Sequence, residues 1–336
     1  MRLLINYIIV VFSFILLSIS VLAQDNLSVE ALPGEGIYGL LRRHNLNPGD
    51  YLNTFLELNK DKLDENLQLI KGKTYLIPTV TVKETAAAKK STGTFPIFGE
   101  KYQEVEFKDE LLRGAVFYIV PGHGGPDPGA VAKTNGHQLC EDEYAYDIAL
   151  RLARNLIEHH AMVYVITRDP NDGIRDEAYL KCDKDEYCWG NKKIPLNITQ
   201  RLNQKVNAVN QLYEKHSGQY QRKIELHVDS RYSNQKVDIF FYYHPGSNKG
   251  KKLGVTLLNT IKQKYEENQP NRGYRGTVSE RNLYTLRNTK PVSSYIELGN
   301  INHDRDRRRL VIESNRQAIA NWLALGLLKD FENSRK

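Results

Sequence analysis

Cysteine is scarce in this chain of 336 residues, which contains only Cys140, Cys182 and Cys188. The three show no Cys-x-x-Cys spacing and lie near no pair of histidines, which argues against a metal site built from cysteine. No cysteine follows the apolar N-terminal run, so lipid attachment there is not expected. In an oxidising compartment Cys182 and Cys188 could close a small loop, and we predict this disulfide, with Cys140 unpaired.

A long hydrophobic run occurs at the N-terminus, where Met1 and Arg2 precede apolar residues that end in Val21-Leu22-Ala23. This pattern predicts a signal peptide, residues 1–23, cleaved after Ala23. The run is also just long enough to stay uncleaved as a membrane anchor. In both cases we expect an exported protein of the periplasm or cell envelope. The 313 residues that remain favour two domains.

Acidic residues are fewer than basic ones, 40 against 47, which gives a net charge of +7. In a cytosolic protein this excess would suggest nucleic acid as a partner. Export makes nucleic acid a poor candidate and anionic cell-wall polymers the expected counter-charge. The densest basic run, residues 305–309, is interrupted by Asp306 and follows Asp304, so we interpret it as the solvated start of a helix.

Residues 28–78 combine two short helical patterns with a strand. Ile37, Leu40 and Leu41 fall at helical spacing, a second helical pattern covers residues 51–59, and residues 67–78 indicate a turn and a strand that stops at proline. This βααβ-like order resembles a LysM domain, a small module that binds N-acetylglucosamine-containing glycans. The matching residues are Gly34-Glu35-Gly36-Ile37, Leu58-Asn59 and residues 72–78. The alternative is a small folded spacer without a ligand.

Residues 79–94 are rich in Thr, Ala, Lys and Ser, which predicts a flexible linker. Beyond it, residues 95–332 alternate apolar runs with amphipathic helices, which predicts an α/β domain with a mixed, mainly parallel sheet and helices on both faces. The runs are 115–120, 162–167, 223–228, 237–243 and 293–296, and the clearest helices are 141–160, 198–215 and about 307–331. Residues 169–196 have no clear period and are expected to form an insertion or long surface loop.

The segment from Val120 to Ala130 places His123 among glycines and prolines directly after an apolar run. His123 is therefore expected at the carboxyl end of a strand, where ligands bind in open α/β sheets. The alternative is a histidine that only caps the strand.

Two further residues are candidates for a site with His123. Glu141 begins a helix whose apolar stripe includes Ala145 and Ile148, so it faces inward and is either a helix cap or a ligand. His227 ends another apolar run. Two imidazoles and one carboxylate are a recurring set of ligands for zinc, with a fourth position left for water.

Glu297 ends a third apolar run and precedes Gly299 by two residues. At a strand exit, a glutamate could take a proton from the attacking water and pass it to a leaving amine. The alternative role is to orient a histidine ligand.

Together these segments resemble the zinc-dependent N-acetylmuramoyl-L-alanine amidases from about Phe95 to Leu328. The matching stretches are His123 to Ala130 with the pattern His-Gly-Gly-x-Asp-Pro-Gly-Ala, Glu141 with Ala149-Leu150, Ile224 to His227, Leu286 to Thr289, and Glu297-Leu298-Gly299. Two stretches depart from the family: Val120-Pro121 stands where Asp-Pro is frequent, and Asn300 to Asn302 replaces a phenylalanine.

The resemblance implies that His123, Glu141 and His227 bind one Zn²⁺ and that Glu297 is the catalytic carboxylate. It makes Asp127, Arg287 and Asn288 candidates for substrate binding. The implied reaction is hydrolysis of the amide between N-acetylmuramic acid and the first L-alanine of peptidoglycan, and an envelope activator protein is a further expected partner. The alternatives are a catalytically inactive adaptor that binds peptidoglycan and a zinc peptidase that acts on stem-peptide cross-links.

Overall fold

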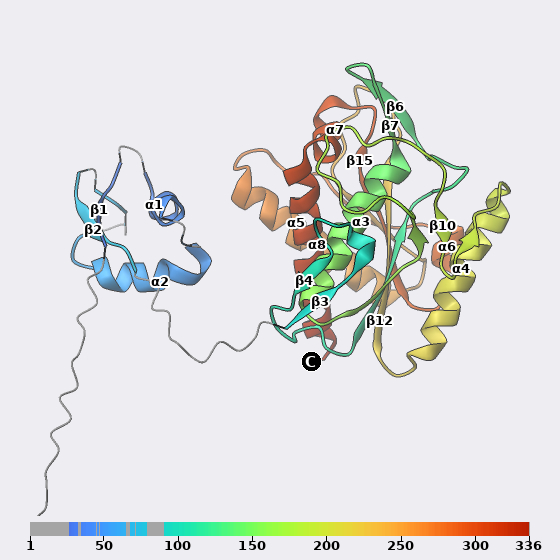
Figure 1. Ribbon diagram of the computed structural model, residues 1–336, viewed down its shortest axis with the longest axis horizontal. Coiled ribbons are helices and arrows are strands. Elements are labelled where there is room, and N and C mark those ends of the chain that lie inside the picture. The colour runs from blue at the N-terminus through green and yellow to red at the C-terminus, as the bar shows by residue number, and fades with distance from the viewer. Residues whose placement is uncertain are drawn as a thin grey trace, which may run out of the picture. The chain divides into compact units, whose positions relative to one another are not determined.

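The computed structural model divides the chain into two compact units, Met1–Ala88 and Lys89–Lys336, which we describe separately (Figure 1). The structure describes residues 27–32, 35–44, 46, 48–64, 68–70, 72–78 and 91–335. The predicted signal peptide, residues 1–23, lies outside the described residues. Among the residues described, no helix combines the length and the apolar character needed to cross a bilayer.

The N-terminal unit has the order strand, helix, helix, strand that the sequence predicts. Its elements are β1 (Ser28–Glu30), α1 (Ile37–Arg43), α2 (Pro48–Asn59) and β2 (Thr74–Leu76), with β1 and β2 antiparallel. Leu40, Phe55 and Tyr75 are fully buried between the helices and the strands. The Asn59 side chain donates to the carbonyls of Phe55 and Leu76 and accepts from the Leu76 amide, which fixes α2 to β2.

The C-terminal unit begins with a small hairpin. β3 (Thr92–Thr94) pairs antiparallel with β4 (Glu104–Glu106), and the short 3-10 helix η1 (Pro96–Phe98) lies between them. The linker prediction was therefore wrong for residues 92–94. A Thr-Gly-Thr stretch has no apolar period, and only pairing with β4 makes it a strand.

A six-stranded sheet forms the centre of this unit, in the order β14-β13-β15-β12-β5-β8. The strands are β5 (Ala115–Pro121), β8 (Met162–Val165), β12 (Tyr220–Asp229), β13 (Phe240–Tyr243), β14 (Val278–Glu280) and β15 (Val292–Asn300). Neighbouring strands are parallel except β13 and β15, which are antiparallel. The predicted mixed, mainly parallel sheet is confirmed.

Helices cover both faces of the sheet, also as predicted, and the alternation of β5 side chains shows which helix packs on which face. Phe117 and Ile119 share one buried cluster with residues of α3 (Glu141–Glu158), α5 (Asn248–Asn268) and α8 (Glu313–Ser334). Val116, Tyr118 and Val120 share another with Ala208, Val209 and Leu212 of α4 (Ile198–Lys215). Because β5 is buried on both faces, it has the continuous apolar sequence from which it was predicted.

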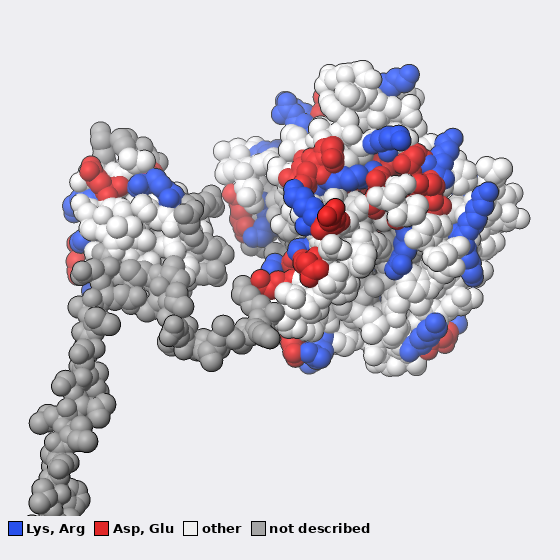
Figure 2. Space-filling model, in the orientation of Figure 1, with Lys and Arg blue, Asp and Glu red and all other residues white. Residues whose placement is uncertain are grey.

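The predicted closing helix is two helices, α7 (Asp304–Val311) and α8, because Ile312 between them has extended backbone angles. The interpretation of the basic run as solvated was wrong for Arg309, which is 6% exposed and donates to Asp238 and Asp306. On the C-terminal unit in Figure 2, acidic and basic side chains lie next to one another. Ion pairs such as Arg113–Glu110 join residues close together in the sequence.

Two small sheets flank the large one. β6 (Val131–Thr134) and β7 (His137–Cys140) form a hairpin before α3. β9 (Thr167–Arg168), β10 (Tyr187–Cys188) and β11 (Lys192–Lys193) form an antiparallel sheet, so the insertion contains two short strands. The helix α6 (Tyr284–Asn288) precedes β15.

The disulfide joins Cys140 to Cys182, and Cys188 is free and buried. The predicted Cys182–Cys188 pairing was therefore wrong. Cys188 lies on β10, opposite Thr167 of β9, and packs in the apolar cluster of β5. Cys182 instead reaches the start of α3, where the amide of Asp183 donates to Glu143 at 2.9 Å.

We predict that Cys182→Ser lowers the free energy of unfolding by roughly 2–4 kcal/mol, because the bond closes a loop of tens of residues. Denaturant unfolding with and without reductant measures this effect, and reductant should destabilise the wild type but not the variant. Peptide mapping without reduction should recover Cys140 linked to Cys182. A peptide linking Cys182 to Cys188 would contradict the pairing.

Candidate metal centre and active site

The loop after β5 places His123 at the carboxyl edge of the sheet. His123 has φ of 53°, a conformation that side-chain-bearing residues adopt rarely. Gly129 has φ of 66°, and a Cβ there would lie 2.6 Å from Glu141 Oε2 and 2.7 Å from the His123 ring. The loop can therefore fold back over His123 and Glu141 only with glycine at position 129.

Glu141 stands where three elements meet. Its Oε1 lies 3.2 Å from His123 Nε2 and 3.0 Å from His227 Nδ1, and the two histidine rings are 5.0 Å apart between centroids. Glu141 Oε1 also accepts a hydrogen bond from the Val228 amide, and Oε2 accepts one from the Ala130 amide. The structure thus brings together all three residues expected to bind metal, and their ligand atoms form a group that could hold an ion.

Both histidines have a carboxylate at the other ring nitrogen. His123 Nδ1 lies 3.0 Å from Asp127 Oδ2, and His227 Nε2 lies 3.4 Å from Glu225 Oε1. Carboxylates in this position fix the orientation and tautomer of an imidazole that binds metal. Tyr295 stacks on the His227 ring at 4.2 Å, which further restricts its rotation.

The carboxylates control the charge of the cluster. Burial disfavours imidazolium, but hydrogen bonds with Asp127 and Glu141 outweigh it and raise the pKa of His123 to about 9. Burial would raise the pKa of Glu141, but the two histidines hold it well below its usual range. Glu141 therefore stays ionised, and its negative charge favours a cation between the two imidazoles.

Glu297 lies beside His227, because the two residues are register partners on the parallel strands β15 and β12. It is 7% exposed, and its Oε2 has no hydrogen-bond partner among the described residues. Burial raises the pKa of Glu297 to about 7. A carboxyl group with this pKa can both accept and release a proton near neutral pH.

Comparison with known proteins identifies the family of this chain. The family model described as N-acetylmuramoyl-L-alanine amidase matches residues 117–329, well over half of the chain. The chain belongs to this family. It is therefore an enzyme, and the match spans all three residues of the metal group together with Glu297.

Several relatives of this amidase are known. The germination-specific N-acetylmuramoyl-L-alanine amidase of Bacillus subtilis (strain 168) is 23% identical over 220 residues, which cover 66% of this chain and 81% of the relative. The N-acetylmuramoyl-L-alanine amidase structure from Clostridium difficile 630 has a TM-score of 0.48 and 21% identity, covering 65% of this chain and 97% of that one. The CwlD amidase from Clostridioides difficile, solved in complex with the GerS lipoprotein, has a TM-score of 0.49 and 18% identity, covering 65% and 98%.

The three residues expected to bind substrate lie in different surroundings. Asp127 contacts His123 and also accepts from Arg201 at 2.8 Å, so its carboxylate is engaged in holding the loop of the amidase. Arg287 and Asn288 belong to α6, where Arg287 donates to Asn282 and Asn288 donates to the Tyr284 carbonyl. These contacts tie Arg287 to its own segment, and the Asn288 carbonyl also accepts from Asn210 of α4.

Two buried residues of the amidase site were missed from the sequence. Glu225 accepts from Lys223 Nζ and from the Thr285 hydroxyl as well as lying against His227. Lys205 donates from Nζ to the carbonyls of Pro121 and His123 and so holds the loop from α4. The signal for Glu225 was available, because residues two apart on a strand share a face. No such signal was available for Lys205, because its contacts depend on how α4 packs.

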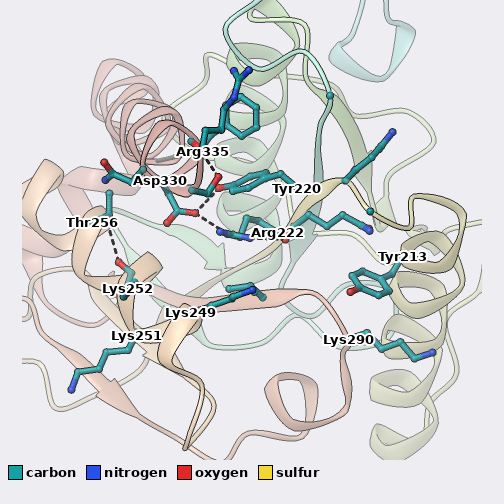
Figure 3. Close-up of a pocket in the computed structure, with 18 of the residues that line it drawn as sticks. Tyr213, Tyr220, Arg222, Lys249, Lys251, Lys252, Thr256, Lys290, Asp330 and Arg335 are labelled. Atoms are coloured by element: carbon teal, nitrogen blue, oxygen red, sulfur yellow. Dashed lines mark hydrogen bonds and ion pairs between the residues drawn. The ribbon is translucent and has the colours of Figure 1, made fainter.

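A hollow of about 1080 Å³ lies at the opposite edge of the sheet (Figure 3). It is lined by the residues that begin β12, such as Tyr220 and Arg222, by Asp330 of α8 and by lysines of α5. Arg222 and Tyr220 both hydrogen-bond to Asp330 there. The residues His123, Glu141 and His227 do not line this hollow.

We predict that Gly129→Ala disrupts the site, because the new Cβ would overlap Glu141 and His123. Gly136→Ala is the matched control: its φ is 78°, but a Cβ there meets nothing within 4 Å. The control should lose only the roughly 1–2 kcal/mol of left-handed backbone strain, and Gly129→Ala should lose more in denaturant unfolding. Equal losses would show that the loop has room at residue 129.

Proposed function

We propose that this chain is an exported peptidoglycan amidase whose single Zn²⁺ is held by His123 Nε2, Glu141 Oε1 and His227 Nδ1. The observation that carries the proposal is the convergence of these three atoms. His227 Nδ1 lies 3.0 Å from Glu141 Oε1, and His123 Nε2 lies 3.2 Å from it. Two ligands about 2.0–2.1 Å from a tetrahedral zinc ion stand about 3.3 Å apart, so the residues fit the ion. The carboxylates behind both imidazoles support the same assignment.

The bond to be cleaved is the amide between N-acetylmuramic acid and the first L-alanine of the stem peptide. Zinc at this site would supply an acidified water and would polarise the scissile carbonyl. Glu297 takes the proton of the attacking water, since its buried carboxyl has a pKa of about 7 and a free oxygen. It then donates that proton to the departing amine nitrogen, which leaves as the free amino group of alanine.

The residues around the ligands act by holding them in place. Asp127 and Glu225 fix the two imidazoles, and Tyr295 stacks on His227. Lys205 donates from Nζ to the carbonyls of Pro121 and His123 and so holds the start of the loop. This support keeps the three ligand atoms in position before substrate arrives, which avoids reorganisation during the reaction.

We predict that Glu297→Gln keeps about one zinc per chain but lowers kcat by roughly 10²–10⁴-fold, because the amide cannot accept a proton. Metal analysis and digestion of purified sacculi measure the two quantities. Glu267→Gln, the same change on the exposed side of α5, is the control and should be unaffected. His227→Ala should lose both zinc and activity, which separates the base from a ligand.

Two other functions remain as alternatives to this proposal. An adaptor that only binds peptidoglycan would release no stem peptides from sacculi, whether or not zinc is bound. A zinc peptidase would release fragments without a free amino-terminal alanine. Mass analysis of the digest therefore distinguishes the three, and full activity of Glu297→Gln would show that the carboxyl has another role.

We also propose that the N-terminal unit binds glycan strands, on the basis of its resemblance to LysM domains and its βααβ order. The predicted envelope activator protein stays a prediction. Tethering a glycan-binding unit to the amidase unit would raise the enzyme's concentration at the wall without changing its chemistry.

Removal of residues 24–88 from the mature chain should weaken sedimentation with sacculi by roughly tenfold or more, as loss of one linked binding module does. Turnover of a small soluble muropeptide should stay the same, because the site lies wholly in the other unit. Equal sedimentation of the two chains would favour the spacer interpretation.

A further inference from the structure

A second group of carboxylates lies next to the proposed zinc site. Asp142 and Glu143 belong to the first turn of α3, and Glu186 belongs to the insertion. One oxygen from each lies within 4.8 Å of the others, and the three residues are only 2%, 1% and 7% exposed. Three buried carboxylates at this separation repel one another strongly unless a positive charge lies among them.

One oxygen in this group has no partner. Asp142 Oδ1 accepts from the Glu143 amide, but Asp142 Oδ2 is buried and has no hydrogen-bond donor in the part of the chain that the structure describes. A buried carboxylate oxygen without a donor costs free energy that native structures rarely leave uncompensated. Asp142 is one of the three residues whose carboxylates each offer an oxygen to this group.

The nearby cations do not balance the group. Arg175 lies 3.0 Å from Glu143 but also pairs with Asp172. Lys205 gives its hydrogen bonds to the carbonyls of Pro121 and His123. Asp142 and Glu186 form no ion pair within the described ranges. The positive end of α3 favours carboxylates in its first turn, but that effect is roughly 0.3–1 kcal/mol per group, too little to hold three buried carboxylates in their ionised form.

We propose that Asp142, Glu143 and Glu186 bind one hard divalent cation, and the chemistry selects Ca²⁺. All the ligand atoms are carboxylate oxygens, which Ca²⁺ and Mg²⁺ prefer, whereas zinc sites generally include imidazole or thiolate ligands as well. Flexible, irregular oxygen cages suit Ca²⁺, because Mg²⁺ demands near-octahedral geometry and keeps its water. This inference does not rest on the zinc assignment.

The cation would join the insertion to the loop of His123. Glu186 Oε2 accepts from the Gly125 amide at 2.7 Å, and Gly125 lies two residues beyond His123. Asp142 directly follows Glu141 in α3. A cation bound by Asp142 and Glu186 therefore holds the insertion against both the metal-binding helix and the metal-binding loop.

The test is calorimetric titration of the mature, zinc-loaded chain with Ca²⁺, and with Mg²⁺ in parallel. We expect one Ca²⁺ per chain with Kd of about 10⁻³ M or tighter, the range of extracellular calcium modules, and weaker binding of Mg²⁺. Saturating Ca²⁺ should raise the Tm of the zinc-loaded chain by about 2–4 °C or more over the Tm of the same chain without Ca²⁺. Absence of Ca²⁺ binding would overturn the proposal and indicate that the carboxylates share a proton instead.

Glu186→Gln removes one charged ligand and should weaken Ca²⁺ binding at least tenfold while zinc content stays at one per chain. Glu177→Gln is the matched control, since Glu177 lies exposed in the same insertion. Unchanged Ca²⁺ affinity in Glu186→Gln would contradict the site. Should that variant fail to fold, Asp142→Asn gives a second measurement, with the same tenfold loss expected and unchanged affinity contradicting the proposal.

Discussion

The site depends on one carboxylate. Glu141 Oε1 faces both imidazoles and accepts from the Val228 amide, while Oε2 accepts from the Ala130 amide. A single side chain thus links α3 to β12 and to the loop after β5. Because its pKa is held low by the histidines, it is a fixed negative charge in a buried position. Burying that charge is favourable only where positive charge and amide donors surround it, which is the condition that also makes a metal site.

The sheet brings such charged groups together because successive side chains of a strand point to opposite faces. On β12, Ile224, Leu226 and Val228 pack with the helices of one face, whereas Lys223, Glu225 and His227 point to the other. Their register partners on β15 place Tyr295 and Glu297 on that same polar face. On this face Lys223 pairs with Glu225, whereas Oε2 of Glu297 has no hydrogen-bond partner among the residues that the structure describes. This oxygen belongs to the carboxyl group that we propose as the base.

This logic explains how much could be predicted from the sequence. The strand-end positions of His123, His227 and Glu297 follow from apolar runs that stop at polar residues, and parallel strands bring such ends to one edge. The inward orientation of Glu141 followed from the apolar stripe of the helix that it begins. The disulfide could not be predicted, since three cysteines allow three pairings and the choice depends on where the insertion packs. The break at Ile312 also left no signal, because one extended residue does not disturb an apolar stripe.

The insertion, residues 169–196, shows why the remaining contacts could not be predicted from the sequence. Apolar side chains such as Leu180 and Ile194 anchor it in the core, but three of its contacts are polar or covalent: the Cys140–Cys182 bond, the Asp183 amide on Glu143, and Glu186 on the Gly125 amide. Hydrophobic periodicity, the main signal for packing in a sequence, says nothing about such contacts. Yet all three reach either the first turn of α3 or the loop of His123. Residues 169–196 are therefore attached to the same helix start that presents Glu141 and to the same loop that presents His123.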